Sequence, residues 1–334
     1  MDILKVLFTE FLDFFRLGGI YGVLMSHNYS SLRTVGGVIA LLTPLAPFVI
    51  FGEMALLLFS DRKRIKEYKV NLLIILINRV FAHLVKFSIM LLGYGVLSKY
   101  APFKVTWSLL WFIYAIVIYE LGTYVYHYSA HKVRILWCFH SIHHSPETLN
   151  ASVTLRTFYL ENLYTELIRT SIVAISGVPL IMYFLVMTID SIWGAFVHIS
   201  EKVLVNGRLG LLEKFVLTPS HHRVHHGRNL LYLDTNYCGM VNIWDRLFGT
   251  YQEEKRHTPV EFGLNRPVQA DNFRDVYFGE FPLLWADIKS AKGLTNKIKY
   301  VFMPPGWRHD VPYLTAKYLK KELVADVPVE EVSH

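Results

Sequence analysis

The stretch HYSAHKVRILWCFHSIHH, residues 127–144, decides how this chain is interpreted. Two histidines lie four residues apart at its start, and three more follow at i, i+3 and i+4 near its end. On a helix these spacings place each set on one face. Imidazoles stacked in this way can converge on one point, as a metal site requires. The five histidines are His127, His131, His140, His143 and His144.

A second cluster, PSHHRVHH at residues 219–226, repeats the pattern about eighty residues later. In it, His222, His225 and His226 have the same i, i+3, i+4 spacing. A lone histidine in an apolar segment is usually a hydrogen-bonded core residue. Eight histidines at repeated helical spacings favour a metal centre instead.

The composition indicates a membrane protein. The chain has 334 residues, of which 53% are hydrophobic and 15% aromatic, and its mean hydropathy is +0.31. Two cysteines exclude a disulfide framework or a thiolate cluster. The net charge of +7 is not accompanied by a nucleic-acid recognition motif. We therefore expect no nucleic-acid partner and assign the charge to anionic lipid head groups on the cytoplasmic side.

Three apolar segments precede the histidine cluster that begins at His127, at Val35–Phe59, Asn71–Leu97 and Trp107–Tyr126. Each is long enough to cross a hydrocarbon core of about 30 Å. The basic loop Asp61–Lys69 is cytoplasmic by the positive-inside rule. Counting crossings from there places His127 at the cytoplasmic mouth of the bundle.

The next apolar segment, Ser171–Val197, cannot be a single crossing, because one site cannot take ligands from both faces of a bilayer. We expect a hairpin that turns near Gly177, with both arms shorter than full spans and His198 back on the cytoplasmic side. A cytoplasmic cap should follow from Lys202, with a disordered tail after Ala325. An amphipathic helix at Ile3–Phe15 is expected on the bilayer surface.

The predicted fold class is therefore an all-α membrane protein. It has about four transmembrane or hairpin helices and a cytoplasmic helical cap that carries a histidine-rich dimetal site. Three regions are expected: 1–106 with the amphipathic helix and the first two spans, 107–255 with the catalytic residues, and 256–334 with the C-terminal cap and tail.

Charged residues within the apolar segments are expected to face the bundle interior. Arg79, His83 and Lys86 share a helix face and are predicted to pair with Glu53; a substrate or head-group role is the alternative. Glu120 lies two turns before His127. It could hold that histidine by its second nitrogen or make a plain buried hydrogen bond elsewhere.

The donor set indicates the chemistry. Imidazole suits iron, zinc, copper and nickel. A tetrahedral metal takes about four ligands, so nine candidates indicate two metals. The zinc-protease motif H-E-x-x-H is absent. The nine candidate ligands are His127, His131, His140, His143, His144, His198, His222, His225 and His226.

The boxes H-x3-H, H-x2-H-H and H-x2-H-H resemble those of the fatty acid hydroxylase/sterol desaturase superfamily. The segments WCFHSIHHSPETLNASVTLR, TPSHHRVHHGRN and DTNYCGMVNIWDRLFGTY are most similar to its alkylglycerol monooxygenase-like branch. The resemblance covers roughly residues 107–306.

This resemblance implies a membrane-bound non-haem di-iron oxygenase that hydroxylates a fatty acyl, alkyl-ether or sterol-like lipid with O2. The eight box histidines would be catalytic metal ligands, and His198 matches the family's additional histidine. Zinc can replace iron in purified protein. The electron donor would be a reductase, a cytochrome or a pterin. The expected location is the endoplasmic reticulum membrane in a eukaryote or the inner membrane in a bacterium.

Five further residues are expected to support the ligands from outside: Glu120, His221, Asp234, Asn236 and Asp245. The DTNY segment, residues 234–237, could equally be only a turn. Two alternatives to hydroxylation stay open, namely a desaturase with the same centre and a non-catalytic membrane metal-binding protein.

Overall fold

The computed structural model describes residues 3–57, 62–310 and 314–325, apart from a few side chains, notably those of residues 79–87. Within these ranges every regular element is a helix, and Val216 and Val241 pair as an isolated bridge. The all-α prediction is therefore confirmed. The expected disordered tail after Ala325 lies outside the described residues.

The N-terminal part differs from the expected pattern at two places. The apolar segment that starts at Val35 is not one helix, because Pro44 cannot continue the hydrogen-bond ladder. The stretch predicted as a basic loop is helical from Arg62 onward. The elements of this part are α1 (Ile3–Phe14), α2 (Gly18–Ser26), the 3-10 helix η1 (Ser30–Arg33), α3 (Val35–Leu42), α4 (Leu45–Leu57), α5 (Arg62–Leu97) and the 3-10 helix η2 (Ser98–Tyr100).

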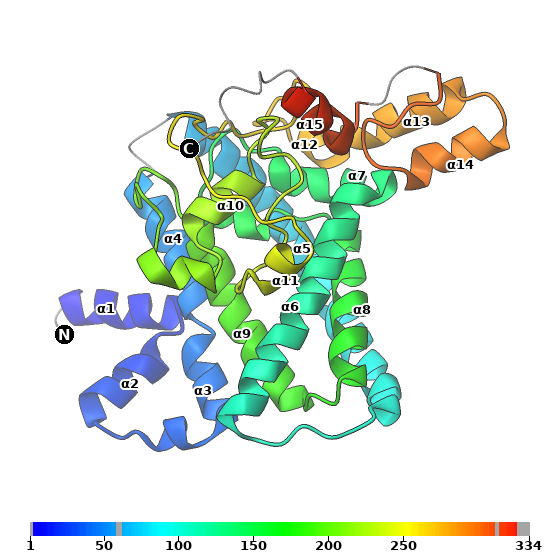
Figure 1. Ribbon diagram of the computed structural model, residues 1–334. Helices are drawn as coiled ribbons and strands as arrows, with labels where there is room; N and C mark the ends of the chain where they lie inside the picture. The colour runs from blue at the N-terminus through cyan, green and yellow to red at the C-terminus, as the bar shows by residue number, and fades with distance from the viewer. Residues whose placement is uncertain (1–2, 58–61, 311–313, 326–334) are drawn as a thin grey trace.

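Four long helices form the bundle that carries the site. α5 packs on α8 (Tyr159–Ile175), and α6 (Leu109–Lys132) packs on both α8 and α9 (Leu180–Val197) (Figure 1). The Ser108 hydroxyl caps α6 by accepting a hydrogen bond from the Trp111 backbone N–H at 3.2 Å. Buried side chains such as Tyr119, Met182 and Tyr183 fill the space between these helices.

The predicted hairpin turn at Gly177 is confirmed. Gly177 has φ +76°, and a Cβ atom there would lie 2.2 Å from the Phe103 carbonyl oxygen, so only glycine fits. The two arms are longer than expected. The first arm, α8, begins at Tyr159 rather than near Ser171. The charged residues before Ser171 are buried against neighbouring elements and do not interrupt the helix. The second, α9, is long enough to span a membrane, so the expectation of two short arms is wrong.

Three segments of the described chain are candidate membrane spans by length and composition: Val35–Leu57, Leu109–Lys132 and Leu180–Val197. The predicted span Asn71–Leu97 is not among them, although it lies within the 36-residue helix α5. That crossing, the orientation of the bundle and the three-region division stay predictions.

Short helices cover one end of the bundle (Figure 1). Glu280 connects two parts of this cap, because its oxygens lie 2.6 Å from Arg134 Nη1 and 2.6 Å from Arg266 Nε. Apart from α8 and α9, the elements beyond α6 are α7 (Arg134–His144), the 3-10 helices η3 (Ala151–Leu155) and η4 (Gly210–Lys214), α10 (Pro219–His225), α11 (Ile243–Leu247), α12 (Phe273–Phe278), α13 (Glu280–Ser290), α14 (Leu294–Phe302) and α15 (Ala316–Ala325).

Candidate metal centre

Four helices present the nine candidate ligands at the capped end of the bundle. His127 and His131 lie one turn apart near the end of α6, and α7 carries the first triad. α10 begins after the Thr218 N-cap with Pro219 in its first turn, carries His222 and His225, and is followed by His226 as its C-cap. His198 follows the last residue of α9. All nine side chains are buried.

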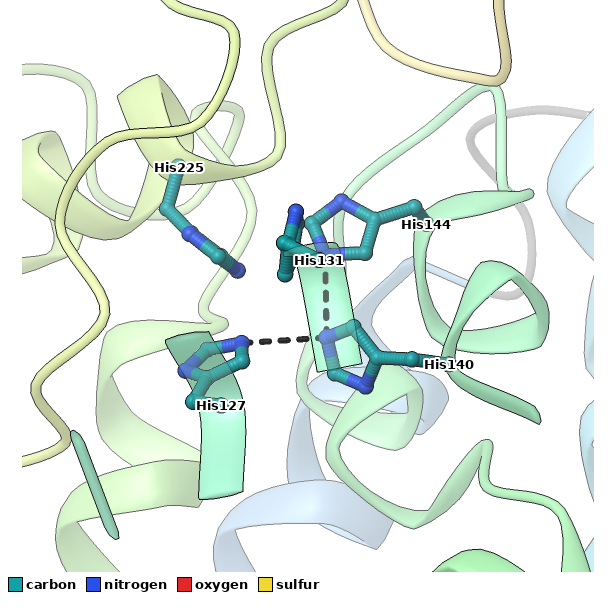
Figure 2. A group of neighbouring side chains, drawn as sticks. All are labelled: His127, His131, His140, His144 and His225. Carbon is teal, nitrogen blue, oxygen red and sulfur yellow. Dashed lines mark hydrogen bonds between the residues drawn. The ribbon is translucent and has the colours of Figure 1, made fainter. Parts of the chain in front are cut away.

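The histidines form two groups, and within each group one potential ligand atom per residue lies within 4.8 Å of every other. In the first histidine group, the Nε2 atom of His140 lies 3.0 Å from that of His127 and 3.2 Å from that of His144 (Figure 2). The members of the first group are His127, His131, His140, His144 and His225.

In the second histidine group, the Nε2 atom of His198 lies 3.2 Å from that of His143 and 2.8 Å from that of His222. His226 and His222 have their Nε2 atoms 3.1 Å apart. These four residues are the second group. The structure thus brings together all nine histidines singled out from the sequence.

The two triads interdigitate. Each gives its i, i+4 pair to one group and its middle histidine to the other. His140 and His144 belong to the first group while His143 belongs to the second. In α10 the assignment is reversed, since His225 joins the first group and His222 and His226 the second. Neither triad completes a group alone.

Hydrogen bonds to oxygen fix which ring nitrogen carries the proton. Nδ1 of His127 donates to the Tyr237 carbonyl and Nδ1 of His225 to the Thr235 carbonyl, each at 2.8 Å. Nδ1 of His198 donates to the Gly194 carbonyl at 2.6 Å. A carbonyl oxygen only accepts, so in each neutral ring Nε2 keeps a free lone pair.

Carboxylates orient two more histidines of the first group. His140 Nδ1 faces Glu161 Oε1 at 2.5 Å, and His131 Nδ1 faces Asp234 Oδ1 at 3.4 Å. Burial alone would raise the pKa of Asp234, but the hydrogen bond from His131 and the Lys132 ammonium lower it to about 2. Such carboxylate–histidine pairs are typical of the surroundings of bound metals.

The donor set fits metal ions. Two ligand nitrogens about 2.1 Å from an ion and at right angles lie about 3.0 Å apart, close to the spacings observed. The Nε2 atoms of His131 and His225 are buried and lack a hydrogen-bond partner among the described residues. Burial and neighbouring histidines lower the pKa of His144, His222 and His226 well below the ordinary value, so these rings stay neutral.

Glu120 does not take the first of its two predicted roles. Its carboxylate accepts hydrogen bonds from the backbone N–H groups of Gly239 at 2.9 Å and Met240 at 3.0 Å. The second nitrogen of His127 faces the Tyr237 carbonyl instead. Glu120 therefore holds the loop that carries this carbonyl, which is the alternative of a buried hydrogen bond elsewhere.

The other supporting residues surround the same loop. Asp245 accepts from the Tyr237 N–H at 2.7 Å and the Cys238 N–H at 2.9 Å. Asn236 donates to the His221 carbonyl at 3.0 Å. Both Asp234 and Asn236 have positive φ, as turn residues do. His221 lies outside both histidine groups, and its Nε2 atom lies 2.8 Å from the Tyr251 hydroxyl.

Sequence reasoning missed Glu161 and the role of Glu53. The signal for Glu161 was an acid in the first turn of the helix that follows the first triad. Glu53 was expected to pair with Arg79, His83 and Lys86, whose side chains lie outside the described residues. That pairing stays a prediction. In the described part of the chain, the Glu53 carboxylate accepts hydrogen bonds from the backbone N–H groups of Ala151 at 2.5 Å and Ser200 at 2.6 Å.

The region that carries the nine histidines matches a known protein family. Residues 112–250 match the family model described as fatty acid hydroxylase. This region is a fatty acid hydroxylase domain. It contains all nine histidines of the two groups, and the resemblance inferred from the histidine boxes is confirmed.

Several curated proteins are similar to the chain that contains this fatty acid hydroxylase domain. Alkylglycerol monooxygenase of Homo sapiens is 35% identical over 65% of this chain and 47% of its own length. The Danio rerio protein of that name is 32% identical over 68% of this chain and 47% of its own length. An ornithine lipid hydroxylase of Rhizobium tropici is 30% identical over 47% of this chain and 46% of its own length. The chain thus spans about half the length of these relatives. No solved structure matches it significantly.

A cavity of about 400 Å³ leads from the cap to the histidines of the fatty acid hydroxylase domain. It reaches His131 and His144 of the first group and His226 of the second. Trp137 and Trp307 also line it, as do charged residues of the cap. Both histidine groups are therefore accessible to a small molecule or to part of a larger one.

Proposed function

We propose that this protein is a membrane-bound lipid hydroxylase that uses two iron ions, O2 and electrons from an external donor. The main support is the pair of interdigitated histidine groups within a fatty acid hydroxylase domain. Relatives named alkylglycerol monooxygenase and ornithine lipid hydroxylase add to this support.

Each histidine group would hold one iron ion, since neutral imidazole nitrogens suit iron. When bound, the two ions would supply the activation of O2. The protein fixes the lone pairs of its rings through Glu161, Asp234 and the carbonyls of Tyr237 and Thr235. All nine rings are buried, which limits the contact of these nitrogens with bulk water.

Among fatty acyl, alkyl-ether and sterol-like lipids, the relatives favour an alkyl-ether lipid of glycerol as the substrate. The apolar bundle would let the alkyl chain enter from the bilayer, and the cavity beside His131 and His144 offers space next to the first histidine group. The electron donor would be a reductase, a cytochrome or a pterin. We place the centre on the cytoplasmic side of the endoplasmic reticulum membrane or of a bacterial inner membrane.

The test uses full-length protein purified in mild detergent from iron-supplemented cells. Metal analysis should give two iron atoms per chain. Incubation with an alkylglycerol, a reductant and ¹⁸O2 should give a product that carries one labelled oxygen atom. His143→Ala should abolish turnover, whereas the exposed His257 lies outside both groups and His257→Ala should change nothing.

Other results would identify the alternatives. An alkene without label would show a desaturase, and tightly bound metal without turnover of any lipid would favour a metal-binding protein. Zinc alone would support the geometry of the site and not its oxidative chemistry. Folded protein without any bound transition metal would overturn the proposal.

A further inference from the structure

An apolar surface patch lies on the polypeptide that follows the bundle. Among its members, Leu211 is 79% exposed, Phe215 70% and Leu247 67%. The segments that carry them are adjacent, because the Asn242 N–H donates to the Phe215 carbonyl at 3.0 Å. The apolar patch consists of Leu211, Leu212, Phe215, Ile243, Leu247 and Phe248.

The patch lies against the middle of α6. The Trp244 indole N–H donates to the Val117 carbonyl at 2.9 Å, and the ring of Phe248 lies 5.1 Å from that of Tyr124. Between these two contacts, the Glu120 carboxylate accepts hydrogen bonds from the backbone N–H groups of Gly239 and Met240, in the loop before α11. Positions 117, 120 and 124 share one face of a helix. α11 and the preceding loop therefore run along α6 (Figure 1).

This placement gives the patch a depth relative to a candidate span. At 1.5 Å per residue, Val117 lies about 12 Å and Tyr124 about 22 Å along the axis from Leu109. Both distances fall within a hydrocarbon core of about 30 Å. If α6 crosses the bilayer, side chains that point outward at this level meet lipid rather than water. An exposed cluster of this size also marks an interaction surface.

Basic residues lie on the same two segments. Lys214 and Arg246 are both exposed, and the Arg246 guanidinium lies 3.8 Å from the centre of the Tyr251 ring. The nearby acid Glu213 is paired with Arg208 at 3.3 Å. Exposed apolar side chains flanked by cations are typical of segments at the boundary between acyl chains and anionic head groups.

We propose that the apolar patch contacts the acyl chains of the bilayer leaflet nearest the histidine centre. Lys214 and Arg246 extend their charged ends toward anionic head groups while their stems stay among the apolar side chains. The loop that ends in α11 also carries the Tyr237 carbonyl that orients His127. One short segment thus connects the lipid contact with the metal centre.

The test measures the depth of a fluorophore on the full chain in vesicles. Leu211→Cys and Leu247→Cys each provide an exposed thiol, whereas the native Cys138 and Cys238 are buried. A bimane label is quenched either by doxyl lipids or by aqueous iodide. The control is Lys292→Cys, at an exposed position between α13 and α14. An unchanged melting temperature in detergent shows that each variant is folded.

Labels at 211 and 247 should be quenched by the doxyl lipids and protected from iodide, and the control label should behave in the opposite way. Iodide quenching at all three positions would overturn the proposal. Protection from both quenchers, with cross-links between chains, would show a contact between copies and would also overturn it.

The charge argument has its own test. In vesicles that contain phosphatidylglycerol, the double variant Lys214→Glu/Arg246→Glu should reduce doxyl quenching at position 247. In pure phosphatidylcholine it should have little effect. Equal effects in both vesicles would refute the role of these cations. None of these readouts depends on turnover, so they are independent of the proposed function.

Discussion

Nδ1 of His140 lies 2.5 Å from Oε1 of Glu161, and both side chains are almost fully buried. The other oxygen of this carboxylate accepts from the Phe158 N–H at 3.4 Å, where α8 begins. A carboxylate accepts, so Nδ1 carries the proton and Nε2 of His140 directs its lone pair to the first histidine group. One acid thus caps a helix and orients a ligand.

Substitution of Glu161 should weaken metal binding. Glu161→Ala is expected to lower affinity by about 10–100-fold, because loss of an outer carboxylate frees the ring and reduces its basicity. Glu161→Gln keeps an acceptor oxygen and should therefore lose less metal affinity than Glu161→Ala. Competition with a chelator measures the affinity. Glu261→Ala is the matched control, because that side chain is 61% exposed; equal losses in the two alanine variants would contradict the assigned role.

Glu53 should contribute to stability more than a typical surface acid. Its two oxygens accept from the Ala151 and Ser200 backbone N–H groups, which lie beyond the first triad and just after His198. Glu53→Gln turns an amide N–H₂ toward one of these donors. We expect a loss of about 2–4 kcal/mol in the free energy of unfolding, measured by chemical denaturation in detergent. Glu10→Gln, at an exposed position, should leave the unfolding curve unchanged.

The two histidine groups should be separable by mutation. His127→Ala removes a member of the first group alone, and His198→Ala a member of the second alone. Each variant should lose close to one metal equivalent per chain and keep the other, because each group has its own donor set. Metal analysis after gel filtration provides the count. Loss of both metals in both variants would mean that the groups act as one cooperative site.

The metal-free protein should become less stable as the pH falls. Burial lowers the pKa of His198 to about 4, and burial with neighbouring histidines lowers that of His222 and His226 well below 6.5. In the unfolded chain these groups titrate near about 6.5. Between about pH 6.5 and 4 the unfolded state therefore binds more protons, so the folded state loses stability as the pH falls through this range. Chelated protein melted at pH 7.5, 6.5 and 5.5 should show the trend, and a constant melting temperature would contradict it.

Much of the histidine grouping could be predicted because the candidate ligands lie at helical spacings. Each i, i+4 pair stays on one helix face whatever the helix packs against, so His140 and His144 had to point together. The division between the groups could not be predicted in this way. It depends on how α7 and α10 are placed relative to each other, which assigns His143 and His225 to opposite groups.

Partners of buried carboxylates were less predictable. Glu120 is two turns from His127 along α6, and spacing alone favoured a contact between them. The loop at Gly239 and Met240 offers two backbone donors that no helical spacing reveals. Similarly, Glu53 meets the chain at Ala151 and Ser200, each about 100 or more residues away in sequence. Such contacts depend on where irregular segments cross the bundle.

The interdigitated triads also set an order for biosynthesis. The first group requires His225, and the second requires His222 and His226, all of which lie on or directly after α10. Neither group is complete until the ribosome has released this segment, by which time α6 and the α8–α9 hairpin have already been made. Synthesis of these helices must therefore precede metal loading of the proposed centre. The nascent chain would hold α7 with six of the nine candidate ligands present and neither group complete.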